Sequence, residues 1–155
     1  MSIVVGMMFP NGGVVMYADK RSVTDFGDRT VTSDNYQKVH MISETIICGI
    51  TGWAEWCLAL VTSLISLRLN NASEMIGFVQ SFPFPSFYDD FGSTITLGGI
   101  YDDGRPFLWT YTTSGATTFQ QDDIGYSVAT NPESLGAICG EYLQIEFRLK
   151  SDMLR

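Results

Sequence analysis

Three polar side chains near the start of the chain are notable because apolar residues surround them. Ser2 precedes the apolar residues 3–9, Asp19 follows the apolar residues 14–18, and Lys38 lies in a third apolar run. Burying an unpaired charge costs several kcal/mol or more. We therefore expect Asp19 and Lys38 to pair or to take part in chemistry, and we treat the three residues as a candidate active site.

Other residues of chemically useful types have simpler interpretations. No Gly-x-Ser-x-Gly elbow accompanies His40, which argues against a Ser-His-Asp triad and favours a half-buried strand histidine. Paired acids at 89–90, 102–103 and 122–123 are typical of turns and solvated loops. An odd number of cysteines without metal-ligand spacing fits reduced thiols. These cysteines are Cys48, Cys57 and Cys139. The sequence therefore predicts neither a metal site nor a cofactor.

The composition is that of a globular protein, with one domain expected over residues 1–155. Of the 155 residues, 45% are hydrophobic and 17% are charged, enough to bury a sizeable core. The net charge of −8 argues against nucleic-acid binding, which needs clustered Lys and Arg. The apolar opening lacks a basic segment and a cleavage site, so no signal peptide is expected. Residues 53–67 are too few and too polar to span a bilayer. We expect a soluble, cytoplasmic protein.

Short hairpins are the elements that must position the three candidate residues. Residues 3–9 form a near-continuous apolar run, as expected for a strand covered on both faces. Residues 14–18 return from a Pro-Asn-Gly-Gly turn as its partner. Residues 19–35 are mostly polar and predict a loop with one short strand near residues 29–32. A second hairpin follows, with strands at residues 38–42 and 45–48.

The hydrophobic period then changes to that of a helix. Apolar residues repeat every three to four positions over residues 53–67, which indicates an amphipathic helix with one buried face. They are Trp53, Trp56, Leu60, Leu64 and Leu67. A shorter helix is predicted over residues 72–82, ending at two prolines. Strands are predicted at residues 93–99, 105–111, 116–120 and 124–129. A last helix should run from about 132 to 149 with Asn131 as its N-cap, and this order suits sheets flanked by helices.

Four segments carry the motifs of one known family in the right order. Residues 18–21 match an Ala-Asp-x-Arg motif, and residues 38–42 match a Lys-Ile/Val-x-x-Ile/Leu strand. Residues 49–55 match a glycine-containing turn that opens a long helix, and residues 94–130 follow a later strand meander. The chain thus resembles proteasome β subunits and their bacterial relative HslV, which are N-terminal-nucleophile hydrolases. The resemblance implies an α+β fold, a four-layer αββα sandwich, C-terminally shortened because the family continues beyond the point where Arg155 ends this chain.

The resemblance also implies a mechanism. In such enzymes the first residue of the mature chain supplies a hydroxyl nucleophile and an α-amine that accepts its proton, since the amine has a reference pKa of about 8. Removal of Met1 would place Ser2 in this role. Lys38 would favour the ionised hydroxyl by its charge, and Asp19 would hold that lysine in place. The amide of Gly52, at a helix N-terminus, would stabilise the oxyanion.

Supporting and substrate-binding positions follow from the same resemblance. Thr130 would supply a supporting hydroxyl, although the usual Gly-Ser-Gly is here Ala-Thr-Asn. Ser22, Tyr36, His40 and Ile50 would line the pocket for the residue before the cut. The apolar Ile50 at its base predicts a preference for hydrophobic side chains.

Each assignment has a purely structural alternative. Ser2 would be a small residue that begins a strand, and Lys38 would be a strand lysine that reaches water. Asp19 would cap a loop, and Gly52 would be an ordinary glycine before a helix. Arg21 is expected to brace the loop rather than to catalyse.

The resemblance implies a peptide or unfolded-protein substrate, a homo-oligomeric ring and an unfoldase as a further partner, and neither nucleic acid nor a membrane is expected. Two alternatives stay open at this point. One is a catalytically inactive structural subunit on the same fold. The other is an enzyme of the same superfamily that hydrolyses a small amide.

Overall fold

Strands and helices follow one another in nearly the predicted order. The structure is a computed structural model that describes residues 2–9, 13–69, 71–83, 92–112, 115–119 and 125–131, the last two ranges through their backbone. The strands and helices are β1 (Ser2–Phe9), β2 (Gly13–Ala18), β3 (Ser22–Asp25), β4 (Thr30–Ser33), β5 (Val39–Met41), β6 (Ile46–Thr51), α1 (Ala54–Leu67), α2 (Ala72–Ser81), β7 (Thr94–Ile100), β8 (Pro106–Thr112), β9 (Gly115–Phe119) and β10 (Gly125–Asn131).

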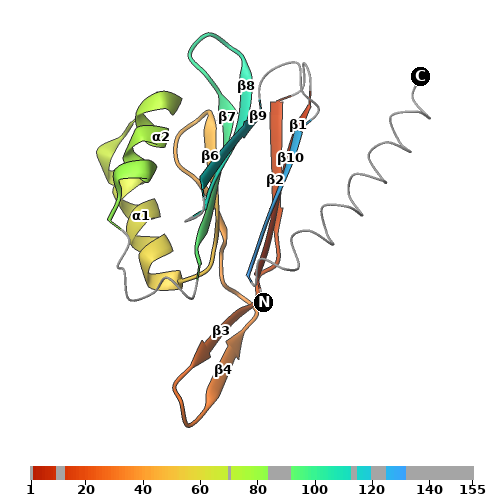
Figure 1. Ribbon diagram of the computed structural model, residues 1–155, viewed down its shortest axis with the longest axis vertical. Coiled ribbons are helices and arrows are strands. Elements are labelled where there is room, and N and C mark those ends of the chain that lie inside the picture. The colour runs from red at the N-terminus through yellow and green to blue at the C-terminus, as the bar shows by residue number, and fades with distance from the viewer. Residues whose placement is uncertain are drawn as a thin grey trace, which may run out of the picture.

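The described elements form a mixed α/β arrangement in three layers. A five-stranded antiparallel sheet has the order β5-β6-β7-β8-β9, and a three-stranded antiparallel sheet has the order β10-β1-β2. The helices α1 and α2 cover one face of the larger sheet, and the smaller sheet lies against its other face (Figure 1). The predicted helix over residues 132–149, which would supply a fourth layer, lies outside the described residues. So do the segment 84–91 and Cys139.

Helix α1 packs through the middle of the predicted stripe, with Cys57 and Val61 buried beside it. Its buried residues recur at positions i and i+4, as an amphipathic helix requires. They are Trp56, Cys57, Leu60, Val61 and Leu64. Leu67 was expected to continue this stripe but is 50% exposed, because α1 ends there and Arg68 turns away in a left-handed conformation. Neither described helix is both long and apolar enough to cross a membrane.

The two sheets approach closely because glycines face the apolar side chains of the opposite sheet. A Cβ placed on Gly49 of β6 would lie 2.5 Å from Val4 Cγ1, and one on Gly98 of β7 would lie 2.6 Å from Val14 Cγ1. Val4 is fully buried at this contact. Along β1, buried residues alternate with partly buried ones, so both faces of this strand are at least partly covered.

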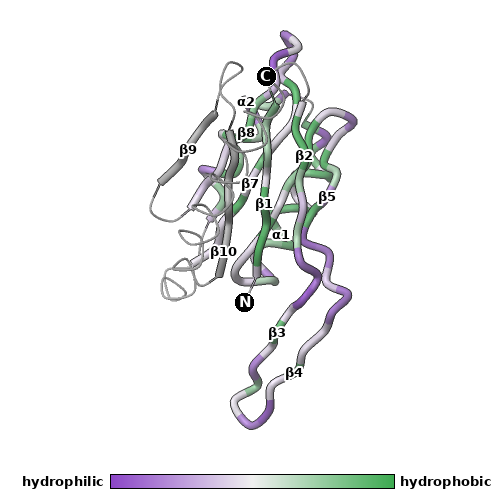
Figure 2. Tube along the Cα trace, turned by 90° about the vertical axis from the view of Figure 1, so that its right-hand side faces the viewer, coloured by the Kyte–Doolittle hydropathy of each residue, from purple (hydrophilic) through white to green (hydrophobic). Residues whose placement is uncertain are grey.

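A hairpin that the sequence did not fully predict projects from the body. Residues 19–35 contain two strands, β3 and β4, rather than one, and both are almost entirely exposed. Figure 2 shows this hairpin as a mostly hydrophilic extension beside the apolar strands of the body. Such a strand has no apolar face to bury, so hydrophobic alternation gives no sign of it.

Candidate active site

Two predicted residues meet where the first hairpin joins the larger sheet. Asp19 directly follows β2, and its amide donates to the Ile3 carbonyl oxygen at 3.2 Å, which extends the β1–β2 ladder by one residue. Lys38 directly precedes β5 rather than lying within it, and its carbonyl oxygen accepts a hydrogen bond from Ile50 at 2.9 Å. The start of β1, the end of β2 and the start of β5 thus bring Asp19 and Lys38 close to the first residues of the chain.

Asp19 and Lys38 form the ion pair that the apolar setting predicts. Lys38 Nζ lies 2.7 Å from Asp19 Oδ2, and the lysine side chain is only 2% exposed. The other carboxylate oxygen of Asp19 accepts a hydrogen bond from the Ile3 amide at 2.6 Å. Asp19 Oδ2 also accepts from the Arg21 amide at 2.9 Å. The carboxylate therefore compensates a buried ammonium and holds the backbone next to Ser2.

The surroundings of Asp19 keep it ionised. Burial acts to raise the pKa of its carboxyl, but hydrogen bonds from Lys38 and from the Ile3 and Arg21 amides outweigh it, so the pKa lies below its usual value. An ionised carboxylate beside a buried ammonium is more favourable than either charge alone. Asp19 is thus ionised at neutral pH beside the buried Lys38 side chain.

Ser2 begins β1 and shares the inward face of that strand. Side chains alternate along a strand, so Ser2 lies on the same side as the buried residues Val4 and Met8. The backbone of β10 runs alongside, with Asn131 opposite Ser2 and Thr130 opposite Ile3. The structure therefore brings the Thr130 backbone next to the candidate nucleophile, while the Thr130 side chain lies outside the described part of the chain.

Gly52 occupies a turn between β6 and α1 that only glycine fits. Its φ of +106° is strained for residues with a side chain. A Cβ at this position would also collide with the Gly92 carbonyl oxygen and lie 2.6 Å from Ser93 Oγ. The next amide, that of Trp53, donates to Ser93 Oγ at 3.1 Å, and α1 begins one residue later. Gly52 thus precedes the electropositive end of a helix.

Two open cavities flank Asp19. One of about 420 Å³ is lined by Lys38 together with the apolar residues Met16, Ala18 and Val39. Another of about 530 Å³ lies beside Ile3 and Arg21. Both cavities reach Asp19, and the first also reaches Lys38.

The four predicted pocket residues are not gathered around these cavities. Ser22 begins β3, and Tyr36 packs half-buried with its hydroxyl 3.5 Å from the Ala54 carbonyl oxygen. His40 is half-buried with Nε2 3.1 Å from the Gln37 carbonyl oxygen, and burial lowers its pKa. Ile50 is 1% exposed within the core under the helices. None of these four described residues lines either cavity beside Asp19.

Arg21 has the bracing role expected of it. Its Nε lies 2.7 Å from Asp34 Oδ1, and both side chains are largely exposed. The Tyr36 amide donates to the Lys20 carbonyl oxygen at 2.9 Å just beyond this pair. These contacts close the base of the β3–β4 hairpin between Asp19 and Lys38.

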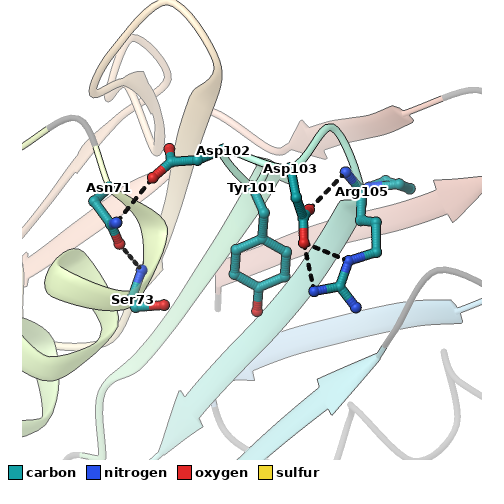
Figure 3. A pocket seen from close by; sticks show the side chains of 7 residues that line it. Asn71, Ser73, Tyr101, Asp102, Asp103 and Arg105 are labelled. Atoms are coloured by element: carbon teal, nitrogen blue, oxygen red, sulfur yellow. Dashed lines mark hydrogen bonds and ion pairs between the residues drawn. The ribbon is translucent and has the colours of Figure 1, made fainter.

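A third, polar cavity of about 340 Å³ lies at the start of α2, away from the candidate site. Asn71 Nδ2 donates to Asp102 Oδ2 at 2.9 Å, and the Arg105 guanidinium pairs with Asp103 at 2.6 Å (Figure 3). The Gly104 amide donates to the Tyr101 carbonyl oxygen at 2.9 Å, as the predicted turn requires. These polar groups are paired with one another. No three His, Cys, Asp or Glu side chains within the described ranges could hold a metal ion together.

Sequence reasoning identified Asp19, Lys38 and Gly52 but not the groups that hold them. The Ile3 amide gives no sequence signal, because any residue except proline supplies one. Ser93 contacts Trp53 across 40 positions of sequence, a separation that local patterns cannot reveal.

A family comparison covers the part of the chain that contains this site. The family model for proteasome subunits matches residues 2–127, which include the strands and helices around Asp19, Lys38 and Gly52. No curated protein matches the chain. On the strength of a match over most of its length, this chain belongs to the proteasome subunit family.

Proposed function

We propose that the chain is an N-terminal-nucleophile peptidase that cleaves peptide bonds through Ser2 after Met1 is removed. The observation that carries the proposal is the buried Lys38–Asp19 ion pair, whose carboxylate also binds the Ile3 amide next to Ser2. A buried lysine beside a hydroxyl nucleophile lowers the cost of ionising that hydroxyl. Family membership supports the class of reaction.

The reaction would proceed in two steps. The Ser2 α-amine accepts the hydroxyl proton, and the hydroxyl oxygen attacks the carbonyl carbon of the scissile peptide bond. The Gly52 amide stabilises the resulting oxyanion, and Lys38 stabilises the developing charge on the nucleophile. Collapse breaks the C–N bond, the proton passes to the leaving amine, and an ester to Ser2 remains. Water then hydrolyses this ester and restores the serine.

The preferred substrate would carry a hydrophobic residue before the cut. Met16, Ala18 and Val39 supply apolar surface to the cavity beside Lys38. Asp19 is the acidic residue that lines this cavity, and it is paired with Lys38. Among the described residues of the cavity, no free carboxylate is therefore left to bind a basic side chain of the substrate. An apolar pocket of this kind favours hydrophobic side chains.

A ring of identical subunits in the cytoplasm, supplied with unfolded chains by an unfoldase, would be the working assembly. Members of the family typically form rings, which supports a homo-oligomer. Size-exclusion chromatography with light scattering would show a single closed assembly if this is correct. A stable monomer at micromolar concentration would contradict it.

The test combines intact mass with turnover. The mature protein should have lost one methionine, and it should hydrolyse fluorogenic peptides with a hydrophobic residue before the cut. Ser2→Ala should abolish turnover, and because alanine is also small, Met1 removal should be unaffected. Ser66→Ala on the outer face of α1 is the matched control and should retain full activity.

The alternatives give different outcomes. A retained methionine with no turnover would indicate a structural subunit. Turnover that survives Ser2→Ala would remove Ser2 from the mechanism. Hydrolysis of small amides without hydrolysis of any peptide would indicate an amidase.

A further inference from the structure

A buried polar cluster surrounds the β6–α1 turn, residues 51–53. Cys57 Sγ lies 3.6 Å from the Thr51 carbonyl oxygen, and Ser93 Oγ accepts the Trp53 amide proton at 3.1 Å. Cys57 is 1% exposed and Ser93 is 5% exposed. Both side chains are therefore shielded from solvent and from substrate, and they act on the turn only through its backbone.

Burial raises the pKa of Cys57 to about 12, and the nearby Ser93 side chain acts in the opposite direction. The thiol is therefore protonated at neutral pH and can donate to Thr51. Two hydrogen bonds therefore hold the turn, one from the Trp53 amide to Ser93 and one from the Cys57 thiol to the Thr51 carbonyl oxygen.

The hydrogen bond from Cys57 to Thr51 fixes the orientation of the Gly52 amide. The C=O and N–H of a trans peptide point in opposite directions. Because the Thr51 carbonyl points toward Cys57 in α1, the Gly52 N–H of the same peptide points away from the helix. Among the described residues, no group accepts a hydrogen bond from this N–H. A preorganised, unpaired N–H is what an oxyanion site requires.

We propose that Cys57 and Ser93 are positioning residues that aim the Gly52 amide at the oxyanion. The proposal rests on the peptidase function put forward above. Neither side chain touches the substrate. They hold the peptide bonds on either side of Gly52, and the lack of a side chain at Gly52 lets the turn lie close against Ser93.

The experiment compares Cys57→Ala and Ser93→Ala with Cys48→Ala, using the mature protein and a fluorogenic peptide. Cys48 is an equally buried thiol on β6, with its Sγ 3.9 Å from the Gly49 carbonyl oxygen and not at the turn, so it controls for lost packing. Each turn variant should lower kcat about tenfold, less than the roughly 100-fold or more for removing an oxyanion donor outright. KM should change little, because the amide acts mainly in the transition state.

Two further measurements separate positioning from packing. A peptide aldehyde, which forms a tetrahedral adduct with Ser2, should bind the turn variants more weakly by the same factor as kcat falls. Cys57→Ser should recover part of the loss because it restores a donor. Cys48→Ala should lower the melting temperature without changing kcat or aldehyde affinity.

Each result has a defined meaning. Turn variants that melt earlier but keep the kcat and aldehyde affinity of Cys48→Ala would overturn the positioning role and leave the peptidase intact. A wild-type protein without Ser2-dependent turnover would overturn the peptidase and, with it, this inference.

Discussion

At the scale of single residues, the Lys38–Asp19 pair links stability to the site. Lys38 is buried with its ammonium 2.7 Å from the carboxylate, and Asp19 also binds the Ile3 amide. Burying an ion pair gains little over burying apolar groups, but removing one partner leaves a costly buried charge. The pair is thus expensive to break, and it is placed where the proposed chemistry needs a fixed cation.

Asp19→Asn should destabilise the protein by about 2–3 kcal/mol. Removing one partner of a fully buried ion pair costs about 3–5 kcal/mol, and the cost is smaller here because the Asp19 carboxylate is one-third exposed. Urea denaturation at pH 7 measures the loss. Asp34→Asn, in the exposed pair with Arg21, is the control and should match the wild type. Equal stability of both variants would show that the buried Lys38 side chain does not depend on the Asp19 carboxylate for stabilisation.

The effect of Asp19→Asn on the free energy of unfolding should depend on pH in a definite direction. The folded pKa of Asp19 lies below its ordinary value of 3.8, so its stabilisation is complete above that value and is lost as the pH falls through the folded pKa. The stability difference between wild type and Asp19→Asn should therefore shrink as the pH is lowered from 5 to 3. A gap that widens toward acid would contradict the pairing.

At the scale of elements, the N-cap of α2 shows which structural features can be predicted from the sequence alone. Asn71 caps α2 by accepting from the Ser73 and Glu74 amides, and its side-chain amide also donates to Asp102. The capping chemistry is local, and it agrees with the predicted start of this helix at residue 72. Such local signals are reliable because they depend on neighbouring residues alone.

Asn71→Ala should cost about 1 kcal/mol, because two amides at the start of α2 lose their acceptor. Thermal denaturation followed by circular dichroism measures this loss. Asn71→Ser keeps a capping oxygen and should restore most of the stability. If serine and alanine destabilise equally, the hydrogen bond to Asp102 rather than the cap is what matters.

The sequence predicts most elements because their hydrophobic periods reflect burial. The helices and the strands of the five-stranded and three-stranded sheets lie within a few residues of their predicted bounds. β3 was missed because its hairpin is exposed to water on nearly all sides. The predicted burial of Leu67 was wrong because the hydrophobic periodicity continues past the last residue that packs against the sheet. At the site, Asp19 and Lys38 stand out as charges among apolar residues, whereas Cys57 and Ser93 look like ordinary core and loop residues.

At the scale of the whole molecule, two sheets in close contact keep the site together. β1 and β2 belong to one sheet, while Lys38 directly precedes β5 and Gly52 directly follows β6 of the other. Glycines at the interface let Val4 and Val14 approach the backbone of the larger sheet. The distance between nucleophile and oxyanion donor therefore depends on this separation.

Gly49→Ala tests the contact between the sheets. The new methyl would lie 2.5 Å from Val4 Cγ1 and 2.6 Å from Met16 Sδ, so overpacking should cost about 1–3 kcal/mol and reduce turnover. Gly77→Ala in α2 meets nothing within 4 Å and should be neutral or slightly stabilising. Similar melting temperatures for the two variants would show that the sheets can separate without cost.

The β3–β4 hairpin leaves the body between Asp19 and Lys38 and is closed at its base by the Arg21–Asp34 pair. A Cβ built at its tip, on Gly27, would meet nothing within 4 Å, and the hairpin carries none of the core. It is thus a natural attachment point for a fluorescent label. A dye on a cysteine introduced at the exposed neighbouring position 28, which does not have the left-handed φ of Gly27, would report on whatever approaches the cavities beside Asp19 while leaving the buried ion pair untouched.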